Sequence, residues 1–166
     1  MINNLIKLIS HYESLHDGDL HEIGLQPKMD PIGIWTEGWG HAILDSDKQF
    51  VKGPKNKVLA YQLSIIHTLD EANHQLEVDM NPILAIIQRK IKVKLNDNQI
   101  AALASFIYNT GGSATLFSLI NSSSPQLYDW WTTHYVTGGG IPLTGLVYRR
   151  KSEAVLFTTG ELKFYN

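Results

Sequence analysis

The chain has 166 residues, of which 43% are hydrophobic and 18% charged, a composition that is ordinary for one globular domain with a sizeable core. Its formal net charge of -2 argues against a protein built to bind nucleic acid. The absence of cysteine excludes disulfides and cysteine metal sites.

The first residues predict a helix rather than a targeting segment. Apolar residues recur at helical spacing through residues 2–12, and the predicted helix ends near Leu15, before the turn residues of 17–19. The segment lacks the apolar core and cleavage site of a signal peptide, and no window reaches the length of a membrane span. We therefore expect a protein that is made in the cytoplasm without a signal peptide and without stable membrane insertion.

Residues 25–44 are rich in glycine, proline and alternating aromatic side chains, which predicts the strands of a hairpin. Alternation along a strand places Thr36 on one face and its neighbours Trp35 and Glu37 on the other. If Thr36 faces a cleft, Trp35 packs on the reverse side of the sheet and Glu37 points away from the cleft.

After about residue 55 the sequence predicts helices. Capping boxes at 68–71 and 96–99 mark the starts of two of them. The second box precedes a strongly apolar segment, which we expect to form the core helix of the larger lobe and to end at the glycines of 109–113. A last helix is expected at about 143–157.

Two carboxyl groups near the start of the chain have the arrangement that glycosidic-bond cleavage requires. Glu13 stands where the first helix ends, and Asp30 opens a turn on the hairpin. Such cleavage needs one acid to protonate the leaving oxygen and a second carboxylate to direct the attack, and Thr36 could hold the same water as Asp30. Each residue also has an ordinary interpretation as a solvated helix end, a turn starter or a strand residue. Only the three residues together, in this order along the chain, are specific for this chemistry.

Several blocks of the chain resemble the phage-type lysozymes of glycoside hydrolase family 24, which cut the glycan strands of bacterial peptidoglycan. The resemblance lies in residues 12–15, 30–41, 69–79, 95–111 and 139–153, which follow the family's order and cover nearly the whole chain. It implies an α+β lysozyme-like fold, with a small β-hairpin lobe, a larger mainly helical lobe and the active-site cleft between them. We place the small lobe at about 16–55 and the helical lobe at 1–15 and 56–166, in one domain.

The resemblance also implies roles for the three polar residues. Glu13 is expected to be the proton donor, Asp30 the second carboxylate and Thr36 its helper. The reaction is then hydrolysis of the β-1,4 bond between N-acetylmuramic acid and N-acetylglucosamine, by inversion in the form we favour. It requires no metal or organic cofactor.

Four further residues are implied as substrate-binding or supporting groups. Asn109 is expected to line the cleft, and Arg149 to pair with Glu13 and fix its rotamer. His41 and Asp79 are expected to form a buried or half-buried ion pair that joins the lobes.

The chain departs from the family in the spacing of its two acids. Glu13 and Asp30 are seventeen residues apart, whereas the relatives have about nine, so residues 16–28 form an insertion. We favour a solvated loop at the cleft mouth. In a second interpretation Glu22 is the true acid. In a third the insertion binds a metal through Asp17, Asp19, His21 and Glu22.

Two rival functions remain open. A lytic transglycosylase needs one acid and no activated water, and a catalytically inactive protein would only bind the wall or serve as a structural part of a phage particle. The expected partner is the peptidoglycan glycan strand, reached by a monomer after holin-type release or another delivery route. Basic residues gather at 89–94 and 149–151, and we expect both clusters to be solvated faces rather than polyanion sites.

Overall fold

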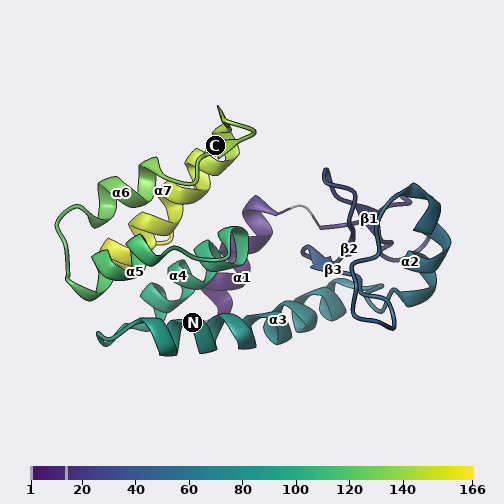
Figure 1. Ribbon diagram of the computed structural model, residues 1–166, viewed down its shortest axis with the longest axis horizontal. Helices are drawn as coiled ribbons and strands as arrows, with labels where there is room; N and C mark the ends of the chain where they lie inside the picture. Colours follow the sequence, from purple (N-terminus) through teal and green to yellow (C-terminus); the bar gives the residue numbers. More distant parts are fainter. Residues whose placement is uncertain (1, 14) are drawn as a thin grey trace. The chain divides into compact units, whose positions relative to one another are not determined.

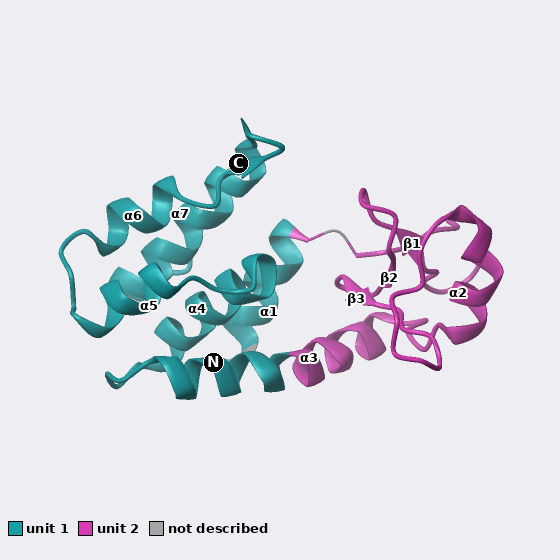
Figure 2. Cartoon of the chain, in the orientation of Figure 1, with its two compact units in different colours: residues 1–12, 80–166 teal, residues 13–79 magenta. Residues whose placement is uncertain are grey.

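The computed structural model describes residues 2–13 and 15–166, and the chain divides into two compact units. We call Glu13–Asp79 the sheet unit, and Met1–Tyr12 together with Met80–Asn166 the helical unit. Figure 1 shows the order of helices and strands, and Figure 2 shows the two units in different colours. The sheet unit extends well beyond the small lobe of 16–55 expected from the sequence.

The sheet unit contains a three-stranded antiparallel sheet in the order β1-β2-β3. Its strands are β1 (Lys28–Met29), β2 (Trp35–Glu37) and β3 (His41–Ala42). Thr36 of the central strand pairs with Lys28 on one side and with Ala42 on the other. The prediction of hairpin strands within residues 25–44 is confirmed.

One face of the sheet packs on α2 (Lys57–Leu63), which follows the short helix η1 (Pro54–Asn56). The buried side chains of this core are Trp35, Ile43, Val51 and Ala60. The indole N–H of Trp35 donates to the carbonyl of Gly53 at 2.8 Å, which satisfies the one polar atom of that side chain. Because neighbouring strand residues point to opposite faces, Thr36 lies on the face turned away from α2.

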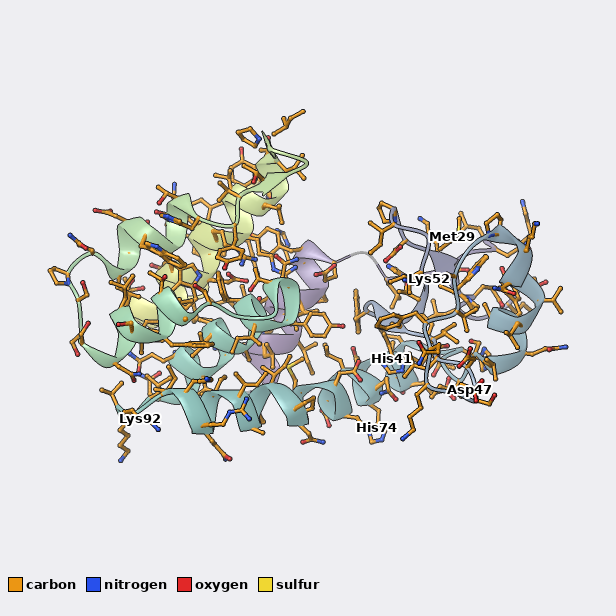
Figure 3. All side chains as sticks on the ribbon, viewed as in Figure 1. Met29, His41, Asp47, Lys52, His74 and Lys92 are labelled. Carbon is orange, nitrogen blue, oxygen red and sulfur yellow. The ribbon has the colours of Figure 1, made fainter. Side chains whose placement is uncertain are left out.

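Helix α3 (Leu69–Lys90) runs through both units, as its two colours in Figure 2 show. Its predicted capping box is present. Thr68 Oγ1 accepts from the backbone N–H of Glu71 at 3.2 Å, and Glu71 Oε2 accepts from the backbone N–H of Thr68 at 3.0 Å. At the other end of the helix the basic side chains of 89–94 are exposed, and Lys92 points outward in Figure 3. This cluster is a solvated face, as expected.

The helical unit is built around one nearly buried helix. Its other elements are α1 (Ile2–Tyr12), α5 (Ala114–Asn121), α6 (Leu127–Thr133), the hairpin β4 (Thr137–Gly138) with β5 (Ile141–Pro142), and α7 (Thr144–Thr159). The central helix α4 (Asp97–Thr110) contacts both α1 and α7, and α6 lies along α7. All residues of α4 from Ala101 to Ile107 are buried. The apolar segment predicted from the sequence is therefore the core helix.

Both ends of α4 follow the sequence rules. Asn96 accepts from the backbone N–H of Gln99 at 3.0 Å, and Gln99 Oε1 accepts from the backbone N–H of Asn96 at 3.0 Å. Gly111 ends the helix in the left-handed conformation, with φ of 80°, which other residues adopt at a cost.

Two expectations about the helices are corrected. The first helix ends at Tyr12 rather than near Leu15, so Glu13 is the first residue beyond it. Arg149 and Arg150 are 2% and 0% exposed, so the basic cluster 149–151 is not a solvated face. Among the helices of the described residues, none combines the length and the apolar composition needed to cross a membrane.

Candidate active site

A buried threonine lies at the centre of the candidate site. Thr36 sits in the middle of β2 and is 5% exposed. Its Oγ1 lies 2.6 Å from Nδ1 of His16 and is placed to donate to the carbonyl of Lys28 at 3.0 Å. The backbone N–H of His16 donates to the carbonyl of Gly38 at 2.8 Å. These contacts hold His16 against the central strand.

The two expected carboxylates share the surroundings of His16. Burial lowers the pKa of His16, and the charge of Lys28 acts in the same direction. A hydrogen bond with the backbone of Thr36 and the charges of Glu13 and Asp30 oppose this shift, but the pKa of His16 remains below its ordinary value of 6.5. The imidazole is therefore neutral at pH 7. Within the sheet unit, His16 thus contacts Thr36 and feels the charges of Glu13 and Asp30.

The carboxylate of Asp30 is oriented by its own turn. Its Oδ1 accepts from the backbone N–H of Ile32 at 2.9 Å and from that of Ile34 at 2.8 Å, while the N–H of Gly33 donates to the Asp30 carbonyl at 3.0 Å. Gly33 has φ of 86°, which the tight turn requires. Among the described residues, no hydrogen-bond donor is directed at Oδ2. Asp30 can therefore fulfil its turn role with one oxygen and keep the second for chemistry.

Glu22 occupies a different region of the sheet unit. It is exposed and lines, with Asp19 and side chains of α2, a pocket of about 420 Å³. Tyr61 of α2 lines the same pocket, and its ring packs edge-on against Trp35 with centroids 6.3 Å apart. Burial and the charges of Asp19 and Glu22 raise the pKa of Tyr61. Glu22 therefore lies beside the helix that covers the face of β2 opposite Thr36.

The insertion offers no metal site. Across the described residues, which include all of 16–28, no three or more histidine and acidic side chains are grouped so that they could hold a metal ion. This arrangement does not support the metal interpretation of Asp17, Asp19, His21 and Glu22.

His41 and Asp79 are in contact. His41 Nδ1 lies 3.0 Å from each carboxylate oxygen of Asp79, and Gln75 donates to Asp79 Oδ1 at 2.9 Å. The hydrogen bond with Asp79 raises the pKa of His41, although burial acts against it. Figure 3 shows His41 beside α3, which carries both partners. His41 lies in the lobe expected at 16–55 and Asp79 in the lobe expected at 56–166, and the structure assigns both to the sheet unit.

Replacing His41 by asparagine is expected to destabilise the protein mainly at acidic pH. Since the folded pKa is raised, the stabilisation is fully present below the ordinary value of 6.5 and is lost as the pH rises through the folded pKa. We expect a loss of about 1–2 kcal/mol at pH 5 and a smaller one at pH 9. Urea unfolding at both pH values measures it. The control is His74→Asn, at an exposed position of α3, the helix that carries Asp79 (Figure 3). Equal losses at both pH values for His41→Asn would contradict the ion pair.

Glu37 is a structural residue that parity alone did not identify. It is 2% exposed, and its Oε2 accepts from Ser64 Oγ at 2.7 Å and from the backbone N–H groups of Ile65 and Ile66 at 3.0 Å each. The carboxylate thereby satisfies three donors in the connection between α2 and α3, and the bond from Ile66 is buried. The one available signal was a charged residue inside an otherwise buried strand.

Two expected site residues belong to the helical unit. Asn109 lies near the end of α4, where its Oδ1 accepts from Arg150 Nη2 at 2.7 Å. Arg149 donates from Nε to Glu153 Oε1 at 3.2 Å and from Nη2 to the carbonyl of Ser105 at 3.3 Å. The pairing of Arg149 with Glu13, which belongs to the sheet unit, stays a prediction.

Comparison with known proteins places the chain in a family. The family model described as phage lysozyme matches residues 20–153, a span that includes Asp30 and Thr36 and begins after Glu13. An endolysin of Acyrthosiphon pisum secondary endosymbiont phage 1 is 29% identical over 160 residues, covering 90% of this chain and 92% of that protein. The SAR-endolysin of Escherichia phage Mu is 28% identical over 142 residues, covering 83% of this chain and 74% of that protein.

A solved structure shows the same fold. The crystal structure of a P22 lysozyme mutant matches with a TM-score of 0.67 and 24% identity, covering 93% of this chain and 94% of that one. The α+β lysozyme-like fold expected from the sequence is confirmed.

Proposed function

Because the chain belongs to the phage lysozyme family, we propose that it is an N-acetylmuramidase. It hydrolyses the β-1,4 bond between N-acetylmuramic acid and N-acetylglucosamine and so lyses bacterial cell walls. One observation supports this most: the charges of Glu13 and Asp30 both act on the imidazole that contacts Thr36. This supports the proposal that a proton donor, a second carboxylate and a hydroxyl act together, which is the set of groups that hydrolysis of a glycoside needs.

In the proposed mechanism Glu13 protonates the leaving oxygen, and Asp30 with Thr36 holds the attacking water. The location of Glu22 supports Glu13 as the acid, because Glu22 lies beside α2, on the other side of β2 from Thr36. We favour inversion, for which the two carboxyl groups stand about 6.5–9.5 Å apart around the water. The anomer released first, read by NMR, distinguishes inversion from a retaining route in which Asp30 is the nucleophile.

The remaining expectations complete the proposal. Asn109 lines the substrate site, Arg149 pairs with Glu13, and His41 with Asp79 supports the sheet unit. The two units form one lysozyme-like domain, which a single family match spanning both of them supports. The protein acts as a monomer on peptidoglycan, after synthesis in the host cytoplasm and holin-type release.

The test is mass spectrometry of muropeptides released from purified peptidoglycan. Reducing N-acetylmuramic acid ends are expected. Anhydro ends would instead identify a lytic transglycosylase, and no released fragments despite binding would identify an inactive wall-binding or structural protein.

Replacing Asp30 by asparagine separates its catalytic role from its turn role. We expect a loss of about 10²-fold in kcat with little change in stability, because the amide keeps the Oδ1 acceptor but loses the basic carboxylate. Asp45 is a matched control: its Oδ1 also accepts backbone N–H groups from the second and fourth residues ahead, Asp47 and Gln49, each at 2.9 Å. Asp45→Asn should leave kcat unchanged. Equal rates for both variants would reduce Asp30 to a turn residue.

A further inference from the structure

The last turn of α1 is anchored by the phenol hydroxyl of Tyr12, the residue that directly precedes Glu13. We propose that Tyr12 is a positioning residue for Glu13, because its hydroxyl ties the end of α1 to α7 and to the segment 160–166 that follows α7. This inference rests on the proposed function, in which Glu13 is the proton donor. Its geometric basis is a set of three hydrogen-bond contacts on one oxygen atom.

The three contacts use the whole hydrogen-bonding capacity of the phenol. A hydroxyl has one proton to donate and two lone pairs with which to accept. Tyr12 Oη donates to the carbonyl of Tyr148 at 3.2 Å, and it accepts from the backbone N–H of Tyr165 at 3.3 Å. Because its proton is used at Tyr148, the 2.5 Å contact with Oγ of Ser152 is a bond that the serine donates. Ser152 is fully buried, so this bond also satisfies a hydroxyl that water cannot reach.

A ring contact adds to the anchoring of the same turn. The imidazole of His11 stacks on the ring of Phe164, with centroids 4.2 Å apart and planes inclined by 22°. The segment that carries Phe164 and Tyr165 is itself held by α7, because the ammonium group of Lys151 lies 4.3 Å from the centre of the Tyr165 ring. His11 and Tyr12 are therefore bound to α7 and to the segment after it, within one compact unit.

The end of a helix is the place where such anchoring has the largest effect. The last carbonyl groups of a helix have no partner within it, and a terminal turn frays at almost no cost in free energy unless other contacts hold it. Glu13 is the first residue after α1, so fraying at Tyr12 would release the backbone of the proposed acid as well. A displacement of about 1 Å can cost on the order of 10²-fold in rate. The Tyr12 hydroxyl therefore restricts Glu13 through the backbone, without touching the substrate.

Tyr12→Phe tests the hydroxyl, because it keeps the ring and removes only the oxygen. We expect kcat to fall about tenfold and KM to stay within about twofold, since the substitution releases the acid but none of the groups proposed to bind the glycan. Tyr128→Phe, at an exposed position of α6 in the same unit, is the control and should leave both values unchanged. An undiminished kcat in Tyr12→Phe would overturn the proposal.

The same substitution in a Glu13→Gln background tests whether Tyr12 acts through Glu13. Tyr12→Phe should lower the residual rate no further there, because the acid that it positions is already gone. An equal loss with and without the acid would mean that the hydroxyl only supports the fold, and the proposal would fall. If Tyr12→Phe does not fold, Ser152→Ala decides in the same two backgrounds, since it removes one of the three bonds to the hydroxyl and should lower kcat about threefold.

Amide hydrogen exchange supplies a readout that does not depend on catalysis. The amides in the last turn of α1 should exchange about tenfold faster in Tyr12→Phe, while those of the core helix α4 should keep their wild-type rates. Unchanged exchange in that turn would overturn the proposal even if kcat fell. Failure of the wild type to release muropeptides would count against the proposed function alone, since the exchange rates still report whether the hydroxyl holds the end of α1.

Discussion

Replacing Glu13 by glutamine is expected to lower kcat by about 10³-fold and to leave the fold intact, if Glu13 is the proposed proton donor. The amide has nearly the same shape as the acid but cannot protonate the leaving oxygen. Glu13 is half-buried and follows the last residue of α1, so the substitution disturbs neither the helix nor the buried core. Initial rates of reducing-end release from purified peptidoglycan measure the effect, with thermal unfolding as the check on the fold.

Glu22→Gln is the matched control for this result. Glu22 is exposed, lies in the same unit and lines the pocket beside α2, so its loss should leave kcat unchanged. Loss of activity with Glu22→Gln alone would place the acid in the insertion, and our alignment of the first helix with the family would then be wrong. If neither variant loses activity, neither glutamate is the acid, and the acid is then unassigned.

Local rules account for much of the agreement between sequence and structure. The capping boxes at Thr68 and Asn96 involve partners three residues away, so the sequence alone specifies them. Strand alternation depends only on neighbouring residues, and it correctly placed Trp35 in the core shared with α2. The turn at Asp30 is likewise closed by residues within four positions.

The contacts that sequence reasoning missed join distant positions. His16 meets Thr36 twenty residues away, and the contact depends on how the insertion returns to the sheet. Glu37 meets the connection after α2 at a separation of up to 29 residues. The buried arginines Arg149 and Arg150 were misjudged because a run of charges normally indicates a solvated face. Their charges are compensated by Glu153 of the same helix, which is also bonded to one residue of α4 and one of α6.

That network makes Glu153 the position where a single substitution should cost most stability. Glu153 is fully buried on α7, and both its oxygens are engaged. Oε1 accepts from Ser105 Oγ at 2.7 Å and from Arg149 Nε at 3.2 Å, while Oε2 accepts from the indole N–H of Trp131 at 3.3 Å and lies 3.3 Å from Arg150 Nε. One carboxylate thus connects α4, α6 and α7.

We expect Glu153→Gln to lower the free energy of unfolding by about 3–5 kcal/mol, because it removes the negative charge that lies between two buried guanidinium groups. Urea unfolding followed by tryptophan fluorescence measures the loss, and Trp131 reports it directly since its N–H is one of the donors. Glu161→Gln, at an exposed position just beyond α7, is the control and should change stability by less than about 0.5 kcal/mol.

The size of the effect distinguishes two interpretations of the buried charges. A loss below about 1 kcal/mol for Glu153→Gln would mean that the arginines are compensated without the charge of Glu153, whose side chain then matters only as a hydrogen-bond acceptor that the glutamine oxygen can replace. A loss of several kcal/mol would mean that Glu153 fixes the guanidinium of Arg149. The pairing proposed between Arg149 and Glu13 would then depend on Glu153 as well. The fraction of Glu153→Gln protein that remains folded should therefore show a lowered kcat, whereas Glu161→Gln should not.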